Sequence, residues 1–132
     1  HKYRELARVW TIKFNEHSKN PAFWNFFSEL NHNLMVGMTN FGDRYFALML
    51  KDPSDDAENL RRFDITADLL KEYGLESAVV EMKAGSAFFK IFSSIYLADF
   101  AAYYLAAKNG VDPTPVDAVE EFKKRLDPSF GK

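Results

Sequence analysis

One carboxylate and two imidazoles stand close together early in the chain, among side-chain amides and large aromatic residues. Glu16 and His17 belong to the segment 15–24, and His32 belongs to the segment 29–33. Polar groups beside bulky aromatic side chains are costly to bury unless something pairs with them. A carboxylate and an imidazole that meet in space from separate elements can move protons to and from a substrate. The two segments therefore predict acid–base chemistry.

A lysine near the C-terminus falls on the apolar side of its helix. The apolar positions recur there at helical spacing: Val116, Val119, Phe122 and Leu126. At about 100° per residue, Lys123 projects between the first two of them, whereas Lys124 points away. One interpretation is a lysine that packs its stem on apolar surface and reaches water with its ammonium group. The other is a cation held over a pocket, where it would stabilise negative charge or move a proton.

The other candidates also have structural interpretations. Glu16 lies at the flank of an apolar helix face, where it could pair with Lys13 or Lys19 at three-residue spacing. His17 projects into the apolar stripe, where a lone histidine is more often a satisfied core residue than a ligand. The histidines lack zinc-site spacing, and the sequence has no cysteine, glycine-rich phosphate loop or nucleophile elbow. The pattern predicts no metal centre, and spacing alone leaves the function open.

Composition limits the class of protein. The chain has 132 residues, 47% hydrophobic side chains and a formal net charge of −2, which fits one domain over residues 1–132. No basic face stands out, so we expect no nucleic-acid partner. The apolar run 84–107 contains Lys90 and Asp99, so we interpret it as a core helix and expect no membrane segment. The absence of cysteine suits an intracellular, cytoplasmic protein. The chain starts without methionine, and we expect it to be a piece of a larger protein.

Hydrophobic periodicity and breaker residues predict an α/β domain. Pro21 separates the first two helices, Asp55 and Glu58 resemble a capping box, and Gly74 closes the helix that follows them. The expected helices are 3–19, 22–30, the amphipathic segment containing Leu60 to Tyr73, 86–108 and 116–126; the expected strands are 34–38, 45–50 and 77–82; a turn is expected at 40–43. Two strands and the helix between them form a βαβ unit with parallel strands, in a short sheet of two or three strands.

Three strings resemble one known family. They are NEHSKNPAFWN at 15–25, ELNHN at 29–33 and NGVDPTPV at 109–116. In this combination the chain is similar to the C-terminal domain of the bifunctional phosphoglucose/phosphomannose isomerases, within the sugar isomerase (SIS) fold group. The resemblance implies a three-layer αβα SIS-like domain with a short parallel sheet, truncated at its N-terminal side.

The resemblance also implies an activity and a set of site residues. Glucose 6-phosphate or mannose 6-phosphate would be converted to fructose 6-phosphate through a cis-enediolate, with Glu16 as the base and no cofactor or metal. His32 and Lys123, with Lys124 as the register alternative, would assist ring opening. Thr114 would leave room for either hydroxyl at C2. His17 and the serine after it depart from the Asn-Ala that the family usually has next to the base.

The resemblance implies partners as well. The family works as a homodimer whose site takes its histidine from the neighbouring chain, and the long helix would suit that interface. Its phosphate grip belongs to an N-terminal SIS domain that this sequence does not contain. Without that grip, binding energy cannot position the sugar, so we expect the isolated chain to be nearly inactive. The alternative is a non-catalytic SIS module that binds a sugar phosphate or dimerises.

Overall fold

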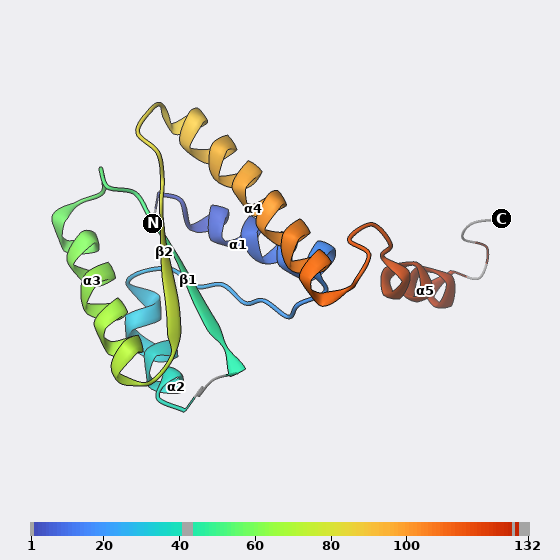
Figure 1. Cartoon of the computed structure of the whole chain (residues 1–132), viewed down its shortest axis with the longest axis horizontal. Helices are drawn as coiled ribbons and strands as arrows, with labels where there is room; N and C mark the ends of the chain where they lie inside the picture. Colours follow the sequence, from blue (N-terminus) through green and yellow to red (C-terminus); the bar gives the residue numbers. More distant parts are fainter. Residues whose placement is uncertain (1, 41–43, 128, 130–132) are drawn as a thin grey trace.

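The computed structural model describes residues 2–40, 44–127 and 129 (Figure 1). Helical elements come first and last among the described residues, and strands alternate with helices between them. The elements are α1 (Arg4–Lys13), the one-turn π-helices η1 (Phe14–Ser18) and η2 (Leu30–Leu34), α2 (Met35–Met38), β1 (Phe46–Lys51), α3 (Ala57–Glu72), β2 (Glu76–Glu81), α4 (Ala87–Asn109) and α5 (Asp117–Leu126). The turn expected at 40–43 lies mostly outside the described residues.

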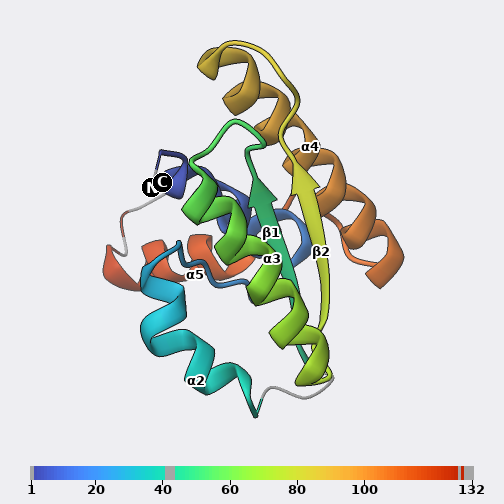
Figure 2. The same cartoon turned by 90° about the vertical axis from the view of Figure 1, so that its left-hand side faces the viewer.

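β1 and β2 form a two-stranded parallel sheet, with Phe46 opposite Glu76 and Lys51 opposite Glu81. The predicted βαβ unit is confirmed, because α3 connects the two strands and both arrows point the same way (Figure 2). β1 begins one residue later than the expected strand 45–50, and β2 begins one residue earlier than the expected strand 77–82. Such small shifts arise because an apolar run marks a strand's core more sharply than its ends.

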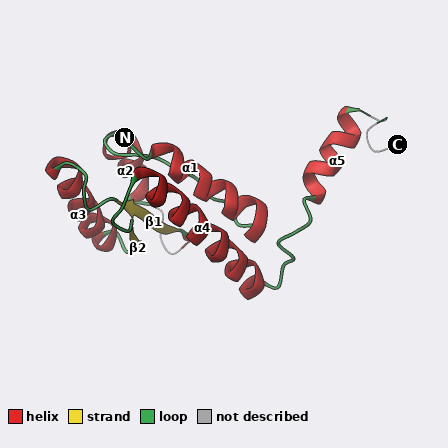
Figure 3. Cartoon of the chain, turned by 90° about the horizontal axis from the view of Figure 1, so that it is seen from above, coloured by secondary structure: helices red, strands yellow, loops and turns green. Residues whose placement is uncertain are grey.

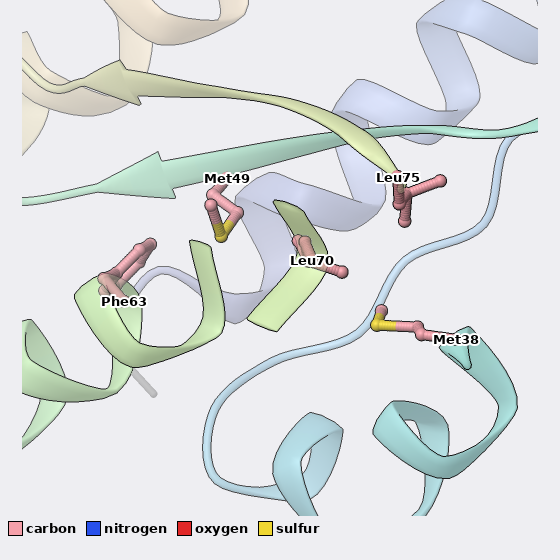
Figure 4. Close-up of a cluster of buried hydrophobic side chains, with 5 residues drawn as sticks. All are labelled: Met38, Met49, Phe63, Leu70 and Leu75. Carbon is pink, nitrogen blue, oxygen red and sulfur yellow. The ribbon is translucent and has the colours of Figure 1, made fainter. Parts of the chain in front are cut away.

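Successive side chains of β1 pack on opposite faces of the sheet. Met49 belongs to a core cluster on the α3 side, where Met38, Phe63, Leu70 and Leu75 are the other buried members (Figure 4). Leu50 packs against a second cluster formed by α1, α4 and the residue after β2: Leu6, Trp10, Ala98 and Met82. Helices therefore cover both faces, with α3 on one side and α1 and α4 on the other (Figures 1 and 2). This is the predicted three-layer αβα arrangement.

The long helix α4 has two unlike sides. Ala98, Ala102 and Ala106 recur every four residues and are fully buried, and α1 packs closely beside this helix. Trp10 Nε1 donates to Ser94 Oγ at 3.0 Å and Lys13 pairs with Asp99 at 2.8 Å, so two further bonds fix α1 on α4. None of the helices in the described part of the chain has the length and apolarity needed to cross a membrane.

The two elements expected between the first helix and β1 are wrong. Residues 21–26 form no regular structure, and the chain becomes helical only from Glu29. The side-chain amide of Asn15 bonds both the N–H and the C=O of Ala22, at 3.1 Å each, which holds the chain away from a helical start there. The segment expected as a strand at 34–38 is helical instead, since Leu34 and Met38 share one helix face that packs toward α3.

Two predicted helix boundaries also change. The first helix continues to Ser18, as expected within one residue, but its last turn is the π-helix η1, and Lys19 then adopts a left-handed conformation with φ 56°. The N-cap of α3 is Asp56 rather than Asp55, because Asp56 accepts from the backbone N–H of Asn59 at 2.9 Å. Glu58 does not close a capping box and pairs with Arg62 on the helix surface.

Candidate active site

Glu16 stands in η1, whose other polar side chains are bonded within the chain. Asn15 bonds the backbone of Ala22, and Ser18 Oγ donates to the carbonyl of Phe14 at 2.6 Å. The carboxylate of Glu16 is exposed and has no polar partner among the described residues. Single π-helical turns are frequent at functional sites. Here the turn presents an unpaired carboxylate, while the neighbouring polar side chains already make hydrogen bonds within the chain.

The Glu16 turn is bound to the loop between α4 and α5. Lys19 Nζ donates to the carbonyl oxygen of Glu16 and, at 2.6 Å, to that of Pro115. His17 Nδ1 lies 3.4 Å from the carbonyl oxygen of Pro113, a contact in which the ring donates when Nδ1 carries the proton. The carbonyls on both sides of Thr114 are thus held by two side chains that follow the candidate base in sequence, His17 and Lys19.

Thr114 is exposed, and its backbone N–H donates to Asp112 Oδ1 at 2.8 Å, which closes a tight turn in the loop. At the base of this loop, Asn109 Nδ2 donates to Asn20 Oδ1 at 2.8 Å. The structure therefore brings the first and third of the three motifs together. Glu16 and Thr114 lie on segments that are joined by hydrogen bonds, although about three quarters of the 132-residue chain separates them in sequence.

His32 lies on the other side of the sheet. It is exposed on η2, which packs against the α3-side cluster through Leu30 and Leu34, whereas η1 packs on α4 (Figure 1). Asn31 Nδ2 donates to Thr66 Oγ1 at 3.1 Å and anchors the turn, while the Asn31 Oδ1 atom is buried without a partner among the described residues. A single chain does not bring His32 to Glu16.

Lys123 lies on α5, which stands apart from the sheet and its covering helices (Figure 3). None of the described residues of α5 is buried, and the predicted apolar stripe is exposed, with Phe122 64% accessible. Lys123 Nζ pairs with Glu120 Oε1 at 2.9 Å, and Lys123 is half-buried whereas Lys124 is exposed. The lower exposure of Lys123 agrees with its predicted place on the apolar side of the helix. However, α5 places neither lysine at the Glu16 turn.

A buried ion pair next to β1 was missed by sequence reasoning. Lys90 Nζ, on α4, donates to both carboxylate oxygens of Asp52, at 2.7 and 2.9 Å, and to Ser54 Oγ at 2.7 Å. Burial alone would raise the pKa of Asp52, but the hydrogen bonds from Lys90 and Ser54 outweigh it and hold that pKa below its ordinary value. The signal was present, since Lys90 stands in the apolar run 84–107 that the sequence predicts as a core helix, where a buried charge needs a partner.

Asp52 follows the C-terminal end of β1, the edge where α/β sheets usually bind ligands. Its oxygens are occupied by Lys90 and Ser54, so the cluster fastens α4 to the strand end. Among the described residues, no three His, Asp or Glu side chains converge as metal ligands.

The sequence matches a family model described as the bacterial phospho-glucose isomerase C-terminal SIS domain, over residues 1–126. Three similar proteins are bifunctional phosphoglucose/phosphomannose isomerases. The protein from Caldicellulosiruptor bescii is 39% identical over 126 residues, which cover 92% of this chain and 37% of that protein. Those from Thermoplasma volcanium and Thermoplasma acidophilum are 33% and 34% identical, each covering 94% of this chain and 40% and 39% of their own lengths.

This chain therefore spans about two fifths of the length of these relatives. The family match covers nearly all of it, and the three-layer fold agrees with the match. The chain belongs to the family of bacterial phosphoglucose isomerase C-terminal SIS domains.

Proposed function

We propose that this chain is the catalytic C-terminal part of a larger enzyme that interconverts glucose 6-phosphate or mannose 6-phosphate with fructose 6-phosphate. The relatives carry the name of that activity. The observation that carries the proposal is the state of Glu16, an exposed carboxylate without a partner among the described residues, in a turn whose neighbouring side chains are bonded. Because bonds from Asn15 and Lys19 hold the turn without this acid, its carboxylate is open to a substrate.

The chemistry requires one carboxylate that serves two adjacent carbons. Glu16 would take the proton from C2 of the open-chain aldose, and the electrons of that C–H bond would form a double bond between C1 and C2 as the carbonyl oxygen on C1 becomes an enediolate oxygen. The same carboxylic acid would return the proton to C1 while the hydroxyl on C2 loses its proton and the oxygen on C1 gains one, so that C2 becomes the ketone and C1 carries the hydroxyl. Because C1 and C2 are bonded neighbours, a side chain held in one place can reach both. Thr114, on the loop that Lys19 joins to the Glu16 turn, would face C2.

His32 and Lys123 would open the sugar ring by giving a proton to the ring oxygen and taking one from the hydroxyl. Since η1 and η2 pack on opposite faces of one sheet, we assign His32 of each site to the neighbouring protomer of a homodimer. The outer side of α4 supports this assignment. It carries a row of exposed aromatic side chains large enough to mark an interface: Phe88, Phe92, Tyr96, Tyr103 and Tyr104.

The rest of the polypeptide would supply the phosphate grip and complete the sheet. Among the described residues β1 pairs only with β2. A hollow of about 600 Å³ runs along β1 and is lined by α1 residues such as Trp10 and α3 residues such as Leu70. Because side chains from both faces line it, the hollow lies along the free edge of β1. We propose that the N-terminal part of the full-length protein covers this edge.

The test is to change Glu16→Gln in the full-length protein and measure incorporation of solvent deuterium at C1 of fructose 6-phosphate and at C2 of the aldose phosphates. Glutamine keeps the size and loses the base, so we expect the exchange rate to fall by roughly 10²- to 10⁴-fold while sugar phosphate binding persists. Glu72→Gln, an exposed glutamate at the end of α3, is the matched control and should keep the full rate. Unchanged exchange in Glu16→Gln would refute the proposal and leave a binding or dimerisation module as the alternative.

Mixing two inactive variants tests the shared site. A heterodimer of a Glu16→Gln chain with a His32→Ala chain contains one site with both native residues only if the histidine comes from the partner. We expect activity to return when the two variants are unfolded and refolded together. If it stays absent while native chains recover activity after the same treatment, the two residues do not act across the interface.

A further inference from the structure

The carbonyls of the two prolines that flank Thr114 are held from outside their own loop. Pro113 and Pro115 each offer a carbonyl but no N–H, so the loop has few donors of its own with which to fix itself. The donors come from the Glu16 turn: Lys19 Nζ reaches Pro115 O at 2.6 Å, and His17 Nδ1 approaches Pro113 O at 3.4 Å. The Lys19 contact is the shorter of the two, and its ammonium carries a full charge, which strengthens the bond.

Lys19 ties both ends of this arrangement. The same ammonium that holds Pro115 also donates to the carbonyl oxygen of Glu16, so one side chain bridges the backbone of the candidate base and the loop of Thr114. Its backbone makes the bridge possible, because the left-handed φ of 56° at Lys19 ends η1 and turns the chain. Among the described residues it is the one non-glycine position with a positive φ.

The position of Lys19 affects α5 as well. The helix α5 starts at Asp117, two residues after Pro115, whose carbonyl accepts the hydrogen bond from Lys19. Because α5 has no buried residue in the described chain, its starting point depends on the loop that precedes it. The Lys19 bridge therefore sets where the helix that carries Lys123 leaves the body of the domain.

We infer that Lys19 is a positioning residue that fixes the separation of Glu16 from Thr114 and thereby sets how the enzyme discriminates between the two aldose phosphates that differ at C2; this rests on the function proposed above. Glu16 removes the proton at C2 and Thr114 faces the hydroxyl there. If the distance between Glu16 and Thr114 is no longer fixed, the two aldose phosphates, which differ in the orientation of the C2 hydroxyl, lose fit in the site by different amounts. The phosphate is gripped elsewhere in the protein, so its contribution to binding stays the same.

The experiment compares Lys19→Met with Lys108→Met in the full-length protein. Methionine keeps an unbranched stem of similar length and removes the ammonium. Lys108 is exposed in the last turn of α4, close in sequence to the same loop. Its side chain makes no hydrogen bond or ion pair with the described residues. The readouts are kcat and KM for glucose 6-phosphate and for mannose 6-phosphate. We expect Lys19→Met to lower kcat by about ten- to a hundredfold and to change the ratio of the two kcat/KM values. Lys108→Met should leave both unchanged.

A second variant separates the ammonium from the backbone turn. Glycine adopts the left-handed conformation without strain, so Lys19→Gly keeps the turn and loses only the bridge. We expect it to show the same changed selectivity as Lys19→Met. If Lys19→Gly keeps the native selectivity, the turn alone matters and the role of the ammonium is overturned. A fall in kcat that is equal for both sugars and follows a lower melting temperature would also overturn it.

The two proposals fail in different ways. Native exchange activity in Glu16→Gln removes the proposed function, whatever the Lys19 variants do. Loss of exchange in Glu16→Gln together with native selectivity in Lys19→Met removes only the role of Lys19.

Discussion

Two regions beside α4 use a carboxylate in opposite ways. At the end of β1, Asp52 is only 4% exposed and its carboxylate accepts four hydrogen bonds, two from Lys90 and two from Ser54. In η1, Glu16 is exposed and its carboxylate has no polar partner among the described residues, although its neighbours are bonded. A buried charge that is fully paired contributes to the fold, whereas an unpaired charge on a fixed frame is available to a substrate.

Asp56 lies between these extremes. It is exposed like Glu16, yet it accepts bonds from the backbone and the side chain of Asn59 at the start of α3. The three carboxylates form a graded series from buried and paired, through exposed and bonded, to exposed and unpaired. Their effects on the free energy of unfolding should follow the same order.

The largest change is expected at the buried pair. Asp52→Ala leaves the Lys90 ammonium buried without its counter-charge, and the free energy of unfolding should fall by about 3–5 kcal/mol. Denaturant unfolding of the full-length protein measures it. The double change Asp52→Leu with Lys90→Met replaces both charges by apolar side chains and should recover most of the loss. A loss below about 1 kcal/mol in Asp52→Ala would show that the pair is no more than a surface contact.

The same pair predicts a dependence of stability on pH. The pKa of Asp52 is lower in the folded protein than its ordinary value of 3.8, since the hydrogen bonds from Lys90 and Ser54 outweigh the opposing effect of burial. A carboxyl with a lowered folded pKa contributes stability above its unfolded pKa, and this contribution is lost as the pH falls through the folded pKa. Unfolding experiments below pH 3.8 should therefore show a falling free energy. Asp52→Asn should flatten that part of the profile, and an unchanged profile would contradict the assignment.

The sequence predicted the framework better than the connections. The two strands and α3, α4 and α5 follow from apolar runs and helical spacing. The error at 34–38 came from choosing the wrong period: Leu30, Leu34 and Met38 recur every four residues, which fits the helix that the structure contains. Periodicity reports which face of an element is buried, but for so short a segment it does not separate helix from strand.

For the candidate site too, the sequence predicted the residues but not the contacts that join them. Residue types and the three motifs marked Glu16 and Thr114, and the structure joins their segments through Lys19 and His17. No local pattern could predict that join, because it consists of side-chain donors reaching proline carbonyls 96 residues away. The roles of His32 and Lys123 remain proposals, since η2 lies across the sheet from Glu16 and α5 stands apart from it (Figure 3).

The intermediate member of the series should give an intermediate effect. Asp56→Ala removes the N-cap of α3, so the N–H of Asn59 loses its acceptor and the free energy of unfolding should fall by about 1 kcal/mol. Asp55→Ala is the matched control, because Asp55 precedes the cap and receives only a bond from the adjacent N–H of Asp56. An equal effect at both positions would contradict the assignment of Asp56 as the cap.

The smallest effect on stability is expected where the effect on activity is largest. Glu16→Gln removes a charge that no described residue pairs with, so the free energy of unfolding should stay within about 0.5 kcal/mol of the native value. Denaturant unfolding of Glu16→Gln beside Asp52→Asn, in the same buffer, compares the two carboxylates directly. A loss at Glu16 as large as that at Asp52 would place both acids in the fold. A stable protein that no longer exchanges deuterium is the combination that an exposed base on a fixed turn requires, because the turn is held by Asn15 and Lys19 and not by the acid itself.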